Sequence, residues 1–157
     1  MFLTVHATIG AVIGQHLPQP WIAFVLGFLS HFFVDLIPHG DQGLASGKTH
    51  EERVRKLLIA VAIDGAVLAC VGATVALHIP LDYPSSAIAG AFGAMLPDGL
   101  QGIAILSREK FLRRFRYFHE RFHLVAHERW SHIVVPFSIG LPLQIATLLF
   151  FLRLLGT

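Results

Sequence analysis

Residues 57–81 form an apolar run of twenty-five positions whose only strongly polar side chains are Asp64 and His78. A helix of about 20 apolar residues is long enough to cross the hydrocarbon core of a bilayer. Because the membrane interior has no water to bind free backbone groups, this run predicts a membrane-spanning helix. Hydrophobic residues make up 54% of the 157 positions and charged residues 14%, which leaves little of the chain for a soluble domain.

Four further apolar segments are expected to be helical and to pack beside this span: residues 2–17, 20–37, 85–106 and 133–155. The first is short, so we expect it to cross tilted or only in part, and we expect the third to be interrupted at Pro97. Small residues that let membrane helices approach closely recur in them: Gly10, Gly14, Ala87, Gly90, Gly93 and Ala94. The sequence therefore predicts an all-α, polytopic membrane bundle of about five hydrophobic segments, as one domain over residues 1–157.

Eleven of the twelve lysines and arginines fall in two connections, residues 38–56 and 107–132. Basic connections stay on the cytoplasmic side of a membrane, and two crossings separate these two. We therefore expect a multi-pass protein with its N-terminus in the cytoplasm.

Residues 3–43 and 57–102 share similar Pro/Gly-rich turns, which indicates an internal repeat. Chance similarity between short turns is the open alternative.

The clearest candidate site lies at the end of the second segment. His31 and Asp35 are four residues apart and share one face of a helix, which Pro38 ends so that His39 and Asp41 follow in the next turn. Imidazole and carboxylate ligands suit zinc and other divalent transition metals. Simple pairing of His31 with Asp35 is the alternative, but the cost of ionisable groups within a membrane favours a functional site.

Two aspartates of other segments are expected at the same depth. Asp64 has no opposite charge within a helical turn, and an isolated buried carboxylate needs a partner from another helix. We expect that partner to be His6, His31 or Asp98, because all lie about 10 Å inside the inner boundary. For Asp98, which follows Pro97, a helix cap is the alternative.

Residues 108–127 predict an amphipathic helix at the membrane surface. Its apolar stripe consists of Phe111, Phe115, Phe118 and Phe122. His119 and His123 lie beside this stripe, and neighbouring arginines are suited to lipid phosphates. A solvated basic helix with incidental histidines is the alternative.

Four stretches carry a resemblance to known proteins: His6-x-x-x-Gly10, the segment from His31 to His39, Leu96-Pro97-Asp98 and the pair of His119 and His123. On these stretches the chain resembles the bacterial inner-membrane proteins described as membrane-bound metal-dependent hydrolases. Through the His-x-x-x-Asp pattern it also looks distantly like zinc-dependent phospholipase C and the related single-strand nucleases. The resemblance implies an inner-membrane hydrolase that binds one or two divalent ions, and zinc is the metal that we expect first.

We therefore expect a metal-dependent hydrolase that acts on a phosphoester or lipid substrate at the cytoplasmic face, with membrane lipids and no nucleic acid as partners. The expected metal ligands are His31, Asp35, His39, Asp41, Asp98, His119 and His123. His6 and Asp64 are expected to be catalytic residues that complete or orient these metal ligands. Arg113, Arg114 and Arg116 are expected to dock an anionic head group.

Two other functions remain open. A non-enzymatic protein that binds or transports a transition metal or protons would use the same cluster. Such a transporter needs ligands that continue across the membrane, and only His16, His78 and Asp82 lie on the far side. A purely structural lipid-binding bundle would leave Asp64 unexplained.

Overall fold

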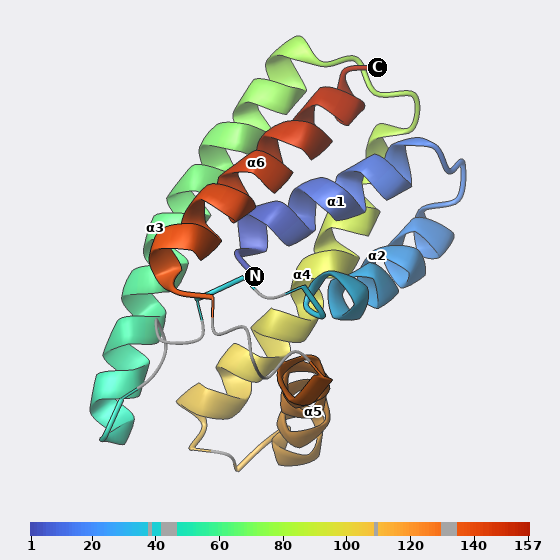
Figure 1. Ribbon diagram of the computed structural model, residues 1–157. Helices are drawn as coiled ribbons and strands as arrows, with labels where there is room; N and C mark the ends of the chain where they lie inside the picture. The colour runs from blue at the N-terminus through green and yellow to red at the C-terminus, as the bar shows by residue number, and fades with distance from the viewer. Residues whose placement is uncertain (38, 42–46, 109, 130–134) are drawn as a thin grey trace.

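The computed structural model of the chain describes residues 1–37, 39–41, 47–108, 110–129 and 135–157, and for residues 123–129 it describes the backbone alone. Within these ranges the protein consists of six helices and has no strand (Figure 1). The helices are α1 (Leu3–Gln15), α2 (Pro20–Val34), α3 (His50–His78), α4 (Pro84–Leu106), α5 (Arg113–Arg129) and α6 (Phe137–Leu155). The predicted all-α class is confirmed.

Three of the helices, α3, α4 and α6, are long and apolar enough to cross a membrane, and α1 and α2 are shorter apolar helices. These five correspond to the five hydrophobic segments expected from the sequence. Helix α3 begins earlier than its apolar run because Thr49 caps it: the hydroxyl oxygen of Thr49 accepts a hydrogen bond from the backbone N–H of Glu52, at 3.1 Å.

Helix α4 is the centre of the bundle, with α1 and α2 packed along it (Figure 1). The packing is backbone to backbone, since a Cβ atom added at Gly10 would collide with the carbonyl oxygen of Gly90, and one added at Gly27 would collide with the same oxygen. Small residues thus permit the close approach that their spacing predicted.

The interruption expected at Pro97 was wrong. Helix α4 continues through Pro97 to Leu106, and Pro97 itself is buried. Membrane helices tolerate proline where neighbouring helices support the backbone, and α1 and α2 pack along this helix. Asp98 therefore lies within a helix and is not the cap of a new one.

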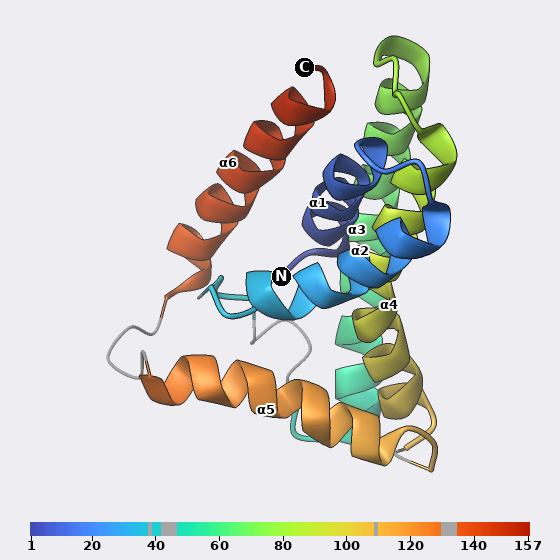
Figure 2. The same ribbon diagram turned by 90° about the vertical axis from the view of Figure 1, so that its right-hand side faces the viewer.

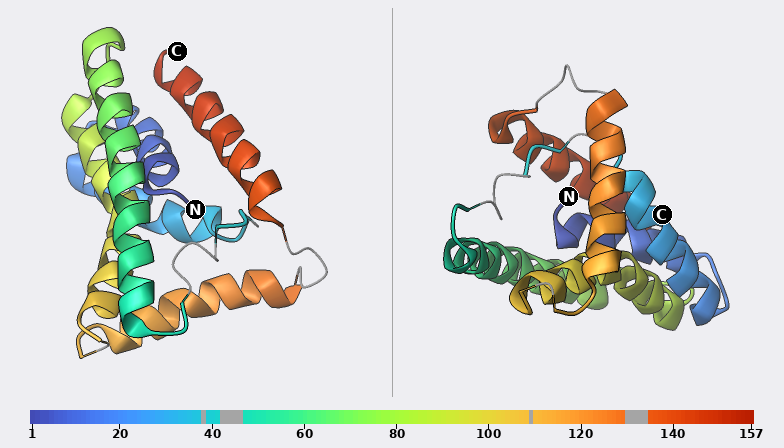
Figure 3. Two further views of the ribbon diagram at one scale, coloured as in Figure 1. Left: turned by 90° about the vertical axis from the view of Figure 1, so that its left-hand side faces the viewer. Right: turned by 90° about the horizontal axis from the view of Figure 1, so that it is seen from below.

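The remaining helices surround this core loosely. None of the residues of α3 is buried, and α6 lies beside α1 (Figures 2 and 3). Near the end of α6 the carbonyl oxygen of Leu154 accepts a hydrogen bond from Nε2 of Gln15 at 3.1 Å. The possible repeat of residues 3–43 in 57–102 stays a prediction.

Helix α5 lies across one end of the bundle, as Figure 2 shows. It begins at Arg113 rather than at residue 108, because the backbone has positive φ at Arg108 (51°) and Leu112 (61°), where no helix can continue. Ring contacts fasten it to α2: the ring centroid of Phe32 lies 5.6 Å from that of Phe118 and 5.0 Å from that of Phe122. Half of the predicted apolar stripe thus holds this helix in place.

Candidate metal centre

Four side chains that could hold a metal ion come together from three helices. His31 and Asp35 come from the end of α2, Asp98 from α4 and His119 from α5. Each offers a ligand atom, and these atoms all lie within 4.8 Å of one another. His31, Asp35 and His119 are buried, and the side chain of Asp98 is 24% exposed. The group that sequence spacing and depth predicted is thus assembled in part.

The spacing of these atoms suits one small cation. The Nε2 atom of His31 lies 2.9 Å from Nε2 of His119, 3.1 Å from Oδ2 of Asp35 and 3.8 Å from Oδ1 of Asp98. The Nε2 atom of His119 lies 3.7 Å from the same oxygen of Asp98. Ligands at about 2.0–2.2 Å from a tetrahedral zinc ion are roughly 3.3 Å apart, so these separations need little adjustment.

The orientation of His31 is set by its neighbours. Its Nδ1 atom lies 2.9 Å from the carbonyl oxygen of Ala94, and because a carbonyl only accepts, Nδ1 carries the proton. The lone pair of a neutral His31 ring is then on Nε2 and points at the cluster, as in metal-binding histidines. The ring of His6 stacks on that of His31, with centroids 4.1 Å apart.

A second group lies on the other side of the two carboxylates. The Nε2 atom of His6 is 3.1 Å from Oδ1 of Asp35 and 4.0 Å from Oδ2 of Asp98, so each aspartate turns one oxygen to His31 and the other to His6. His39 and Asp41 join this side, with Nε2 of His39 2.9 Å from Oδ1 of Asp41. The arrangement is that of two carboxylates between adjacent cation positions.

The amino group of Met1 lies in this second group. Its nitrogen is 2.9 Å from Oδ1 of Asp35, 2.9 Å from Nε2 of His39 and 3.6 Å from Oδ2 of Asp41. Burial lowers the pKa of this amino group, but the carboxylates of Asp35, Asp41 and Asp98 outweigh burial and raise it to about 10. A positive charge is therefore stable here.

The same balance holds for Asp41. Burial raises the pKa of the Asp41 carboxyl. The hydrogen bond from His39 and the charge of the Met1 ammonium lower this pKa by more than burial raises it, so the pKa lies below its usual value. Asp41 is thus ionised beside the cation that it faces.

Gln144 of α6 supports this second group and was missed from the sequence. Its side-chain oxygen accepts from the backbone N–H of Phe2 at 2.7 Å, and its nitrogen donates to the carbonyl of His39 at 3.0 Å. Gly140 lets α6 come this close, because a Cβ atom there would collide with the carbonyl oxygen of His39. Gln144 is the one amide side chain of the mostly apolar segment 133–155, and this was the signal available in the sequence.

Asp64 finds a partner on another helix, but not among the expected ones. Its carboxylate accepts hydrogen bonds from the backbone N–H of Leu3 at 2.6 Å and of Thr4 at 3.4 Å, and from the Thr4 hydroxyl. Asp64 thus caps the start of α1 from the middle of α3, instead of contacting His6, His31 or Asp98. Since His6 lies two residues after Thr4, Asp64 fixes the start of the helix that carries His6, and its expected part in catalysis stays a prediction.

We expect Asp64→Leu to lower the thermal stability of the detergent-solubilised protein, because it leaves the first N–H groups of α1 without a cap inside the bundle. The loss should be about 1–2 kcal/mol, the usual cost of a deleted helix cap. The control is Asp82→Asn, which removes a charge outside the helices. Equal melting temperatures for Asp64→Leu and the wild type would show that the cap is unimportant.

The other expected residues are placed as follows. Arg113 and Arg114 are exposed, whereas Arg116 is half-buried and its Nε donates to Glu120 at 2.7 Å. The side chain of His123 lies outside the described residues. His16 and His78 lie at the ends of α1 and α3, away from this cluster.

Comparison of the chain with known protein families, with curated proteins and with solved structures found no match.

Proposed function

We propose that the protein is a membrane-bound metal-dependent hydrolase that acts on a phosphoester or lipid substrate. The observation that carries this proposal is the buried set of two imidazoles and two carboxylates, His31, Asp35, Asp98 and His119, whose ligand atoms lie within 4.8 Å of one another. Burying such groups within a membrane bundle is costly, and a metal ion offsets that cost directly. The resemblance to membrane-bound metal-dependent hydrolases points to the same chemistry.

The donor set fits a divalent ion, and zinc suits its mixture of nitrogen and oxygen best. His31, Asp35, Asp98 and His119 would hold this ion. On the side of His6, His39 and Asp41, the Met1 ammonium takes the place of a second cation. When bound, such an ion acidifies water and polarises a phosphoryl oxygen, which is the chemistry that phosphoester hydrolysis requires.

The protein's own groups prepare this site. The carbonyl of Ala94 keeps the proton of His31 on Nδ1, and Gln144 holds the turn that carries His39. The Nδ1 atom of His6 is buried and lacks a hydrogen-bond partner in the described part of the chain, so it is available to a water molecule or substrate. Asp98, the partly exposed member, marks the side from which a substrate reaches the cluster.

The test is hydrolysis by the purified protein reconstituted with zinc or manganese. Bis(p-nitrophenyl) phosphate, p-nitrophenyl phosphate and short-chain phospholipids cover diester, monoester and lipid substrates. We expect turnover of at least one, abolished by a chelator and by His31→Ala. Metal-loaded protein that hydrolyses none of them, but carries zinc across proteoliposomes, would favour the transport alternative instead.

We further propose that the protein spans the bacterial inner membrane with its N-terminus in the cytoplasm, because its basic connections are then both cytoplasmic. In a Cys70→Ala background, cysteines at Lys48 and Arg114 should react with an impermeant reagent only after the membrane is opened. A cysteine at Leu81 should react in intact spheroplasts. Labelling of Lys48→Cys and Arg114→Cys from opposite sides would contradict this topology.

A further inference from the structure

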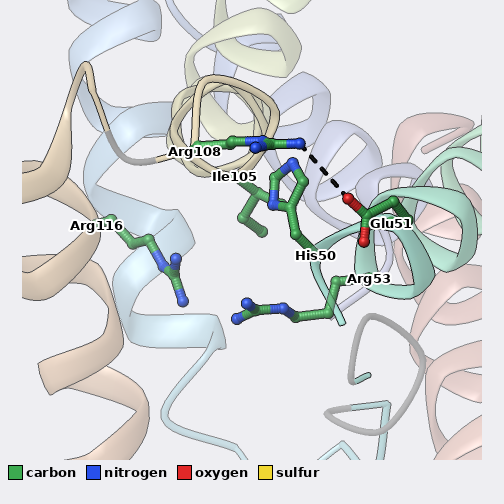
Figure 4. A pocket seen from close by; sticks show the side chains of 6 residues that line it. All are labelled: His50, Glu51, Arg53, Ile105, Arg108 and Arg116. Carbon is green, nitrogen blue, oxygen red and sulfur yellow. Dashed lines mark hydrogen bonds and ion pairs between the residues drawn. The ribbon is translucent and has the colours of Figure 1, made fainter. Parts of the chain in front are cut away.

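A second, strongly basic site lies at the end of the bundle, where the start of α3, the end of α4 and the start of α5 meet (Figure 4). It is a pocket of about 250 Å³ lined by His50, Glu51, Arg53, Ile105, Arg108 and Arg116. Three of these six residues are arginines and one is an acid. Arg53 and Arg108 belong to the two basic connections but were not among the residues that the sequence suggested for substrate binding.

The single acid neutralises little of this charge. Glu51 contacts Arg108 at 3.5 Å, and the two side chains are 75% and 68% exposed, so the pair is weak in water. Arg116 is held by Glu120 of its own helix at 2.7 Å. No acid among the described residues pairs with Arg53, and the lining residues together carry a net positive charge.

Arg53 also carries an unsatisfied donor. Its Nε atom is buried and has no hydrogen-bond partner among the described residues. Figure 4 shows the guanidinium of Arg53 extending toward that of Arg116 across the pocket. A buried donor without an acceptor is unfavourable, and a tetrahedral anion with several oxygens would satisfy it.

The backbone at Arg108 supports the same conclusion. Arg108 follows the last residues of α4 with φ of 51°, a left-handed conformation usually taken there by glycine. An arginine in this position is strained, yet it turns its side chain over the pocket (Figure 4). The start of α3, which carries His50 and Glu51, adds the positive end of a long helix dipole.

We propose that this pocket binds a phosphate group, either on a lipid head group or as a free phosphate. Arginines bind phosphate with paired, charge-assisted hydrogen bonds. One of the three arginines that line the pocket, Arg116, belongs to α5. Arg116 and His119 are three residues apart on α5 and share one face, about 4.5 Å apart along the axis. The same helix, α5, thus contributes one residue to the pocket and one to the metal centre.

Binding in this pocket requires no metal, whereas its use for substrate rests on the proposed function. The test therefore measures binding to detergent-solubilised protein in the presence of a chelator, so that no turnover occurs. Isothermal titration with inorganic phosphate is one arm, and titration with dihexanoyl phosphatidic acid is the other, with dihexanoyl phosphatidylcholine as the zwitterionic control.

We expect phosphate-group binding that Arg53→Gln and Arg108→Gln each weaken by about tenfold, as loss of a charge-assisted contact predicts. The matched controls Arg55→Gln and Arg121→Gln replace exposed arginines of α3 and α5 outside the pocket, and binding should stay within about twofold of the wild type. Tighter binding of phosphatidic acid than of phosphate identifies a lipid ligand, and equal binding identifies free phosphate.

Absence of binding to both probes would overturn the proposal, as would an equal loss in all four variants, which indicates only general surface charge. Arg108→Gln keeps the test valid if Arg53→Gln fails to fold, because the side chain of Arg108 is largely exposed. Phosphate binding by a protein without hydrolase activity would contradict the proposed function and leave this site standing.

Discussion

Asp35→Ala is expected to reduce the metal content of the purified protein from about one ion per chain to background, because a lost ligand removes both a bond and the local charge balance. Asp35 is the most connected member of the centre: Oδ2 lies 3.1 Å from His31, and Oδ1 lies 3.1 Å from His6. No other side chain described at the site faces both histidines this closely.

Elemental analysis after dialysis measures this effect, with His16→Ala and His78→Ala as controls at the far ends of their helices. Affinity in Asp35→Ala should fall at least about a hundredfold, more than the loss from an outer partner. Asp35→Asn keeps the shape of the side chain, so it separates loss of charge from loss of fold. Wild-type metal content in Asp35→Ala would remove the case for this site.

Gly90→Leu is expected to unfold the bundle or to lower its melting temperature severely. Gly90 lies where α4 meets α1, and any Cβ atom there would collide with the carbonyl oxygen of Gly10. Backbone atoms cannot move aside as side chains do, so the cost should exceed the usual 1–3 kcal/mol of overpacking, at about 3 kcal/mol or more.

The matched control is Gly72→Leu in α3, where an added Cβ atom meets nothing within 4 Å. The two variants carry the same substitution within apolar helices, so they differ only in the space around them. Thermal unfolding in detergent compares them. If both melt at the same temperature, the backbone contact between α1 and α4 is not what holds the bundle together.

The helices could be predicted because a membrane forces apolar runs to satisfy their own backbone groups. The interruption expected at Pro97 failed for a tertiary reason, since α1 and α2 support α4 along its length. The spacing of His31 and Asp35 placed them on one face, and this depends only on helical periodicity. The meeting of Asp98 with His119 required knowledge of how α5 docks on α2 through Phe32.

The partner of Asp64 could not be predicted from the depth of Asp64 in the membrane. The sequence indicates that a buried carboxylate needs a partner, but it does not show where a short neighbouring helix begins. Helix α1 starts beside the middle of α3, so its uncapped N–H groups, rather than a histidine, became the partner of Asp64. Gln144 was missed for a similar reason, because its partners are backbone groups of distant segments.

The most direct test of the metal centre is anomalous diffraction from crystals of the metal-loaded protein, recorded at the absorption edge of the bound element. We expect a peak about 2.0–2.2 Å from Nε2 of His31 and Nε2 of His119, with oxygens of Asp35 and Asp98 completing the shell. A peak elsewhere in a stoichiometrically loaded protein, with His31 and His119 still in direct contact, would contradict this account.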